Sequence, residues 1–131
     1  MDRVRYRFVL RAAVTAMQIL HMAARPPGIE ILRVLHLDAS GLVVGLTEHS
    51  DNLPGQVAVP VRRIVAEALA CQAMTLVLSH NHPGGDPQPS RADIAATNHL
   101  VRIVSALGIR VHDHIVTGKG RDFSFRAAGM L

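Results

Sequence analysis

Residues 74–93 read MTLVLSHNHPGGDPQPSRAD and place three local structures in direct succession. The apolar run over residues 74–78 predicts a short buried strand. A loop rich in proline and glycine follows it, and Ser90 is expected to begin a helix. Alternate side chains on a strand share one face, so His80 and His82 are expected to project together beyond the strand's end. The stretch therefore predicts a strand–loop–helix unit that carries two imidazoles at its centre.

Two histidines and a carboxylate at this spacing form a candidate metal site. Asp93 falls in the first turn of the expected helix, where its carboxylate can face the two histidines. Two nitrogens and one oxygen leave a tetrahedral zinc with one open position, which is typical of catalytic zinc sites. The same donors also form the open iron triad, and Ser90 with Asp93 fits a helix capping box on its own. The spacing alone therefore leaves zinc, iron and a structural role open.

Length and composition indicate a single folded domain in a reducing compartment. The chain has 131 residues, of which 49% are hydrophobic and only 3% aromatic, so we expect a core of aliphatic side chains. Its apolar runs are all shorter than the ~20 residues of a membrane span, and the N-terminus lacks the apolar segment of a secretory signal. The single cysteine, Cys71, cannot form an internal disulfide. We therefore expect a cytoplasmic protein that does not enter the membrane.

The charge balance is basic, with 14 Lys and Arg against 10 Asp and Glu and a formal net charge of +4. Four arginines cluster near the N-terminus, at positions 3, 5, 7 and 11. A solvated edge and a basic arm that contacts nucleic acid or an acidic protein both fit this cluster. The aromatic side chains that would stack on bases are limited there to Tyr6 and Phe8. Nucleic acid therefore stays open as a partner.

Hydrophobic periodicity and turn residues divide the chain into strands and helices. The expected strands cover residues 29–38, 42–49, 57–59, 74–78, 109–116 and 122–125. The expected helices cover residues 10–24, 61–73 and 90–107. Gly108 is expected to end the last helix. This order predicts an α/β fold in which helices flank a mixed β-sheet.

The spacing His80-x-His82-x7-Ser90-x2-Asp93 matches the JAMM signature of the JAB/MPN+ metallopeptidase family at every position. The longer string over residues 80–93 looks like the RadC-like branch of that family. Four functional positions at fixed spacing inside a longer matching string make this resemblance specific. It implies a zinc site formed by His80, His82 and Asp93, with water in the fourth position.

The resemblance extends over nearly the whole chain. It continues to residues 113–115 and 123–125 and covers roughly residues 10–131. One small departure is Gly84, where RadC-like proteins often have serine. The resemblance implies a cytidine-deaminase-like JAB/MPN fold, with residues 1–131 forming one RadC-like JAB domain. The N-terminal helix-hairpin-helix region of full-length RadC proteins is not expected in this chain.

The JAMM pattern also requires a glutamate upstream, at the start of the first strand. In RadC-like proteins this glutamate stands eight residues before an aspartate that closes the strand, and Glu30 and Asp38 have this spacing. Glu48 and Glu67 are the rival positions. The resemblance implies that Glu30 takes a proton from the water and later delivers it to the leaving amine. It also implies that Ser90 donates a hydrogen bond to the oxyanion.

The reaction that the resemblance implies is hydrolysis of an amide or isopeptide bond in a peptide or a ubiquitin-like protein. Two alternatives remain open. One is a RadC-like accessory module associated with DNA repair and without peptidase activity. The other is a catalytically silent scaffold. The sequence does not indicate an oligomeric state.

Other histidines of the chain have different expected roles. His36 and His49 lie in the expected first hairpin, where a structural role is favoured over metal ligation. His112 and His114 flank Asp113 on one expected strand. Asp113 is therefore a candidate for orienting a ligating imidazole, as carboxylates beside metal ligands often do. A structural hydrogen bond is the alternative interpretation for this residue.

Overall fold

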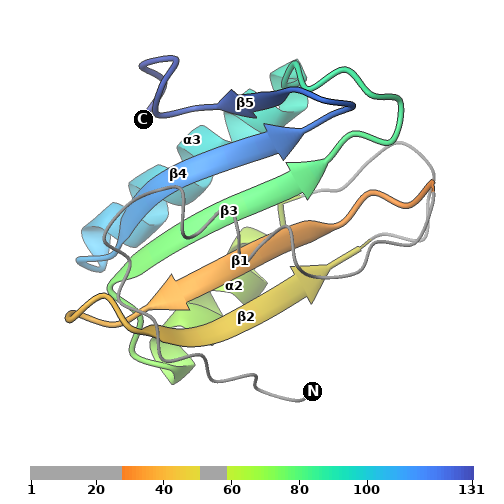
Figure 1. Cartoon of the computed structure of the whole chain (residues 1–131). Coiled ribbons are helices and arrows are strands. Elements are labelled where there is room, and N and C mark those ends of the chain that lie inside the picture. Colours follow the sequence, from red (N-terminus) through yellow and green to blue (C-terminus); the bar gives the residue numbers. More distant parts are fainter. Residues whose placement is uncertain (1–27, 51–58) are drawn as a thin grey trace.

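One five-stranded sheet organises the part of the chain that this computed structural model describes, residues 28–50 and 59–131 (Figure 1). Its strand order is β2-β1-β3-β4-β5, and α2 and α3 lie together on one face. The strands are β1 (Leu32–Leu37), β2 (Val43–His49), β3 (Thr75–Asn81), β4 (Arg110–Thr117) and β5 (Asp122–Ser124). The helices are α2 (Val61–Ala70) and α3 (Arg91–Ala106). The expected α/β fold, a mixed sheet with packed helices, is confirmed.

The sheet combines antiparallel and parallel pairs. β1 runs antiparallel to both β2 and β3, β3 runs parallel to β4, and β5 runs antiparallel to β4. A parallel pair needs a crossover connection, which α3 supplies between β3 and β4. The end of β3 that carries the histidines therefore lies in the middle of the sheet, between β1 and β4.

Three expectations fall wholly or mostly on residues that the structure does not describe. They are the helix over residues 10–24, the arginine cluster at residues 3–11 and the short strand over residues 57–59. Val59, which is described, belongs to no strand.

Three boundaries differ from the sequence expectation by more than one residue. β3 ends at Asn81 rather than at residue 78, because its pairing with β4 continues through residues 79–81, so His80 lies within the strand and not beyond its end. β1 begins at Leu32 rather than at residue 29, because the N–H of Ile31 donates to the side-chain oxygen of Asn81 at 2.8 Å instead of to a strand partner. α2 ends at Ala70, short of residue 73, because the chain turns at Gln72, where φ is 57°. This left-handed conformation cannot continue an α-helix.

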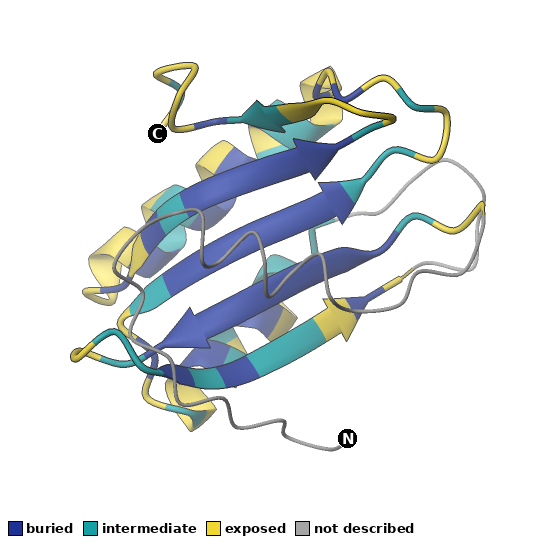
Figure 2. Ribbon diagram, in the orientation of Figure 1, coloured by how far each residue is buried: buried dark blue, intermediate teal, exposed yellow. Residues whose placement is uncertain are grey.

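Both faces of the central strands are buried, as the dark ribbons of β1, β3 and β4 show in Figure 2. β1 is buried at all six positions, which is typical of a strand that is covered on both faces. The core on the helix face includes Leu32, Val34, Ile64, Leu76, Leu78 and Leu100. A second cluster on the opposite face consists of Leu35, Leu37, Val43 and Val77. This two-sided burial holds the strand ends that position the site.

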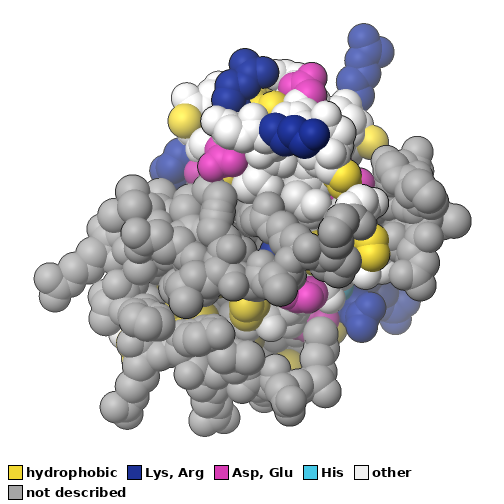
Figure 3. Space-filling model, turned by 45° about the vertical axis from the view of Figure 1, so that its right-hand side comes forward, with side chains coloured by type: hydrophobic (Ala, Val, Ile, Leu, Met, Phe, Trp, Pro, Cys, Tyr) yellow, Lys and Arg dark blue, Asp and Glu magenta, His cyan; other side chains and the backbone are white. Residues whose placement is uncertain are grey.

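Charged side chains of both signs share the described surface. On the face shown in Figure 3, Lys and Arg side chains are scattered and acidic side chains lie among them. Neither α2 nor α3, the helices of the described ranges, is long and apolar enough to cross a membrane.

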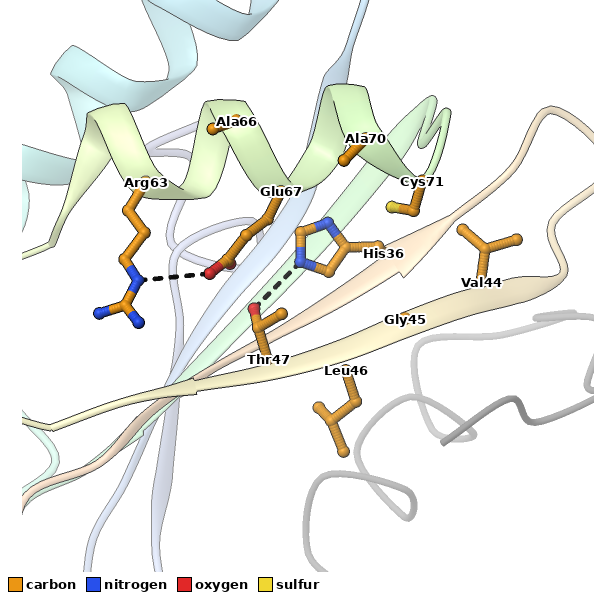
Figure 4. A pocket seen from close by; sticks show the side chains of 10 residues that line it. All are labelled: His36, Val44, Gly45, Leu46, Thr47, Arg63, Ala66, Glu67, Ala70 and Cys71. Atoms are coloured by element: carbon orange, nitrogen blue, oxygen red, sulfur yellow. Dashed lines mark hydrogen bonds and ion pairs between the residues drawn. The ribbon is translucent and has the colours of Figure 1, made fainter. Parts of the chain in front are cut away.

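A cavity of about 520 Å³ lies between β2 and α2 and contains a buried polar cluster (Figure 4). His36 is only 1% exposed, and its Nε2 lies 3.1 Å from Thr47 Oγ1. The same hydroxyl lies 3.3 Å from Nε2 of His49. The Nδ1 of His36 has no hydrogen-bond partner among the described residues. Burial lowers the pKa of His36 from 6.5 to about 4, although the nearby Glu67 carboxylate opposes this effect.

The lowered pKa of His36 predicts that acid destabilises the fold. Between pH 6.5 and 4 the unfolded chain binds a proton on this ring that the folded chain excludes, so the free energy of unfolding should decrease as the pH falls. The change in pKa corresponds to about 3 kcal/mol at most. His36→Gln should flatten the pH dependence measured by urea unfolding, and His99→Gln on the exposed face of α3 should not. Equal pH slopes in His36→Gln and the wild type would contradict this prediction.

Candidate metal centre

The two imidazoles of the His-Asn-His stretch meet at the carboxyl end of β3. His80 is the penultimate residue of the strand and is 3% exposed, and His82 follows directly after it. The main-chain N–H of His82 donates to the carbonyl of Thr117 at 2.8 Å, which extends the pairing of β3 with β4 by one residue. The Nε2 atoms of the two rings lie 2.9 Å apart. Both side chains therefore project to the same side, as the strand pattern predicts.

The loop after β3 fixes the ring of His82. Its Nδ1 lies 2.7 Å from the carbonyl oxygen of Asp86. A carbonyl oxygen only accepts, so Nδ1 carries the proton and Nε2 keeps a lone pair. The loop is held in turn by Lys119, whose N–H donates to the carbonyl of Gly85 at 2.9 Å. Gly118 is required at this contact because a Cβ there would collide with the same carbonyl oxygen.

Asp93 is held in the first turn of α3 by a capping box with Ser90. The N–H of Ser90 donates to Asp93 Oδ2 at 2.8 Å, and the N–H of Asp93 donates to Ser90 Oγ at 3.0 Å. The same Oδ2 lies 3.5 Å from Nε2 of His80 and 3.4 Å from Nε2 of His82. Burial alone would raise the pKa of this carboxyl, but its contact with the His80 ring and the hydrogen bond from the N–H of Ser90 outweigh burial and hold the pKa well below its usual range. One carboxylate thus caps the helix and faces both histidines.

Glu30 reaches the same point from the segment that precedes β1. Its Oε1 lies 3.5 Å from Nε2 of His82. One donor atom from each of Glu30, His80 and His82 lies within 4.8 Å of the others. The side chains of these residues and of Asp93 are between 4% and 18% exposed. Two imidazoles and two carboxylates from three separate segments therefore converge in one largely buried place.

The separations of the donor atoms fit a small tetrahedral cation. Zinc bonds of about 2.0–2.1 Å to nitrogen and oxygen place tetrahedral donors about 3.3 Å apart. The corresponding separations among His80, His82 and Asp93 are 2.9, 3.5 and 3.4 Å. Two lone pairs that face one another at these distances repel, and either a shared proton or a metal cation between them removes the repulsion. The residues therefore fit a metal ion, and their donor types suit zinc and iron.

The rival glutamates lie elsewhere. Glu48 on β2 pairs with Arg33 on β1, with 2.9 Å between Nε and Oε1. Glu67 on α2 lies 3.2 Å from Nε2 of His49. The metal-capable group contains Glu30 and neither of its rivals.

Asp113, expected from the sequence to be a candidate for orienting a ligating imidazole, is engaged elsewhere. Its Oδ1 accepts the N–H groups of His114 and Arg126 at 2.7 and 3.0 Å, and its Oδ2 accepts the hydroxyl of Ser124 at 2.6 Å. These bonds tie β4 to β5 and to the C-terminal segment. Successive side chains of a strand point to opposite faces. It is therefore His114, rather than Asp113, that contacts the ring of His80, at 2.7 Å.

The two histidines beside Asp113 have different surroundings. Burial, with a smaller contribution from His80, lowers the pKa of His114 to about 3. His112 lies nearer the start of β4, 3.5 Å from the guanidinium of Arg110. Of the two, only His114 therefore belongs to the surroundings of the metal-capable group.

The residue between the two ligating candidates holds Glu30 in place. Asn81 Oδ1 accepts the N–H of Ile31 at 2.8 Å, and Asn81 Nδ2 donates to the carbonyl of Ile29 at 2.8 Å. These two bonds flank Glu30 in the segment where β1 has not yet begun. This role could not be predicted from the sequence because it depends on a contact between residues 50 positions apart. The one indication of this role in the sequence was the amide side chain that lies between the two histidines.

Replacing Asn81 should release the segment that carries Glu30. In Asn81→Ala the N–H of Ile31 loses its acceptor, so its hydrogen exchange should become about tenfold faster, as expected for one lost hydrogen bond. Amide exchange measured by NMR should show no such change in Asn98→Ala, a control on the exposed face of α3. Unchanged exchange at Ile31 in Asn81→Ala would contradict the assigned role.

Comparison with known proteins places this arrangement in a family. The sequence profile of the RadC-like JAB domain matches residues 10–130. A UPF0758 protein of Rhodobacter capsulatus is 43% identical over 130 residues, which cover 99% of this chain and 61% of the relative. UPF0758 proteins of Ruegeria pomeroyi and Variovorax paradoxus are 35% and 37% identical, over 98% and 99% of this chain and 58% of each relative. The chain thus spans about three-fifths of the length of these curated relatives. Since the profile match covers nearly all of its residues, the chain belongs to the RadC-like JAB domain family.

Proposed function

We propose that the protein is a zinc-dependent metallopeptidase or isopeptidase that hydrolyses an amide or isopeptide bond. The observation that carries the proposal is the convergence of two imidazoles and two carboxylates at the end of β3. Membership of the JAB domain family, which is broadly related to hydrolases, supports it.

The proposed zinc ligands are His80, His82 and Asp93, and Glu30 is the proposed general base. Asp93 is favoured as the third ligand because one of its oxygens lies within 3.5 Å of both imidazole nitrogens and is anchored by the helix cap. Glu30 approaches the group from the side of His82, at 3.5 Å. Three protein ligands leave one position open for water, which a fourth protein ligand would fill.

Each side chain then has a defined part in the reaction. Bound zinc would lower the pKa of a coordinated water to about 7. Glu30 accepts a proton from the attacking water and returns it to the leaving amine. Ser90 Oγ accepts the N–H of Asp93, so its own O–H proton can be donated to the oxyanion of the substrate. The low exposure of the site strengthens these electrostatic interactions because water screens them less.

The proposed substrate is an extended peptide or the C-terminal tail of a ubiquitin-like protein, the substrate class that the JAMM resemblance implies. A DNA-repair-associated accessory module without peptidase activity is the second candidate. The basic charge balance and the N-terminal arginines favour that candidate.

Exchanging the two carboxylates one at a time should separate their roles. Glu30→Gln should bind one zinc ion as the wild type does but lose about 10²–10⁴-fold in turnover, because general acid–base catalysis typically contributes this much. Asp93→Asn should lose zinc. Glu67→Gln, a rival glutamate on α2, should keep both properties. Zinc binding is measured by calorimetry, and turnover with peptide and ubiquitin-like fusion substrates.

Two results would decide against these roles. Wild-type turnover by Glu30→Gln would remove the glutamate from the mechanism. Loss of zinc by Glu30→Gln together with retention by Asp93→Asn would reverse the ligand assignment. Salt-sensitive DNA binding by a wild-type protein that cleaves no amide substrate would favour the second candidate.

A further inference from the structure

A chain of three short hydrogen bonds links the backbone of α3 to the ring of His80. Thr97 Oγ1 donates to the carbonyl of Asp93 at 2.7 Å. The Nδ1 of His114 lies 2.7 Å from Thr97 Oγ1, and its Nε2 lies 2.7 Å from Nδ1 of His80. Thr97 and His114 are both fully buried, so water does not compete for these bonds.

The carbonyl of Asp93, at one end of this series of hydrogen bonds, determines which atom donates in each of them. Because a carbonyl only accepts, the hydroxyl proton of Thr97 points at Asp93. Thr97 Oγ1 must then accept the proton of His114 Nδ1. A neutral imidazole carries one N–H, so the Nε2 of His114 is an acceptor, and the proton between the two rings belongs to Nδ1 of His80. The Nε2 of His80 is left with a lone pair that faces His82.

Packing fixes the plane of the His114 ring. The ring stacks on Phe125, with 4.7 Å between the centroids and 9° between the planes. Phe125 is itself fully buried, and its N–H donates to the carbonyl of His114 at 3.0 Å. The segment after β5 therefore holds the ring of His114 in the orientation that directs one nitrogen to Thr97 and the other to His80.

We propose that Thr97 and His114 are positioning residues that fix His80 in its Nδ1–H tautomer and so present its Nε2 as a metal ligand. The proposal rests on the metal centre proposed above, but it does not depend on the peptidase activity. The hydrogen-bond chain begins at the main chain of Asp93, whose carboxylate faces the same Nε2 atom at 3.5 Å. Two proposed ligands are thus linked to each other through α3 and β4.

Thr97→Val tests the donor–acceptor direction of these hydrogen bonds, with Thr97→Ser as its matched control. Valine has the shape of threonine but offers no acceptor, so His114 is expected to carry its proton on Nε2, where it can donate to His80. His80 must then accept at Nδ1 and carry its own proton on Nε2, which faces the metal-binding position. Serine keeps the hydroxyl and should preserve the wild-type arrangement.

Two measurements on the intact protein test this expectation. NMR of the metal-free protein labelled with ¹⁵N-histidine should show His80 as the Nδ1–H tautomer in the wild type and in Thr97→Ser, and as the Nε2–H tautomer in Thr97→Val. Zinc affinity, measured by competition with a chelator, should fall about 10- to 100-fold in Thr97→Val alone, the usual effect of losing a group that orients a metal ligand. Thermal unfolding establishes that both variants are folded.

An Nε2–H tautomer of His80 in the metal-free wild type would overturn the proposal, whether or not either variant folds. Equal zinc affinities in folded Thr97→Val and Thr97→Ser would also overturn it. Failure of the proposed peptidase reaction would leave both readouts intact, so the two failures are distinguishable. A wild type that binds no zinc would remove the metal centre and this proposal with it.

Discussion

Two ring nitrogens that face each other at the end of β3 impose the constraint on which the rest of the site depends. The Nε2 atoms of His80 and His82 lie 2.9 Å apart, where either a shared proton or a bound metal cation satisfies both nitrogens. The carboxylates of Asp93 and Glu30 supply the negative charge that stabilises such a cation in a place largely excluded from water. The sheet makes this convergence possible because β3 lies between β1 and β4, so neighbouring segments reach its end from both sides.

Three polar residues, at the N-cap of α3 and in its first turns, position the site and also make hydrogen bonds to the helix backbone. Ser90 and Asp93 complete the cap of its first turn, and Thr97 donates to the carbonyl four residues earlier. Spacings of three and four residues place these side chains on one face of the helix. The cap fixes the carboxylate, and the threonine hydroxyl orients the imidazole of His114 toward His80. Local helix chemistry and the geometry of the metal centre therefore reinforce each other.

The parts of the site that the sequence could predict are those set by local chemistry. The apolar run before the histidines, the Pro/Gly loop and the Ser90–Asp93 cap each follow from neighbouring residues, and the α/β fold followed from the order of such segments. The position of Glu30 at the site was expected only from the family resemblance, because no local sequence pattern links it to the end of β3 some 50 residues later.

The remaining contacts could not be predicted because they depend on how distant segments approach one another. Asn81 holds the segment around Glu30 by accepting the N–H of Ile31, the same bond that delays the start of β1 to Leu32. His114 meets His80 across 34 residues of sequence. The sequence made Asp113 a candidate for the orienting group, because carboxylates often orient a ligating histidine, with a structural hydrogen bond as the alternative. Because side chains alternate between the two faces of β4, it is His114 that contacts the ring of His80.

X-ray diffraction from crystals grown with zinc, measured at the zinc absorption edge, tests the central claim most directly. A single anomalous peak is expected about 2.0–2.2 Å from Nε2 of His80, Nε2 of His82 and a carboxylate oxygen of Asp93, with Glu30 beyond bonding distance. The absence of a peak at the end of β3, or a peak bound by other residues in its place, would contradict the metal centre and the reaction proposed for it.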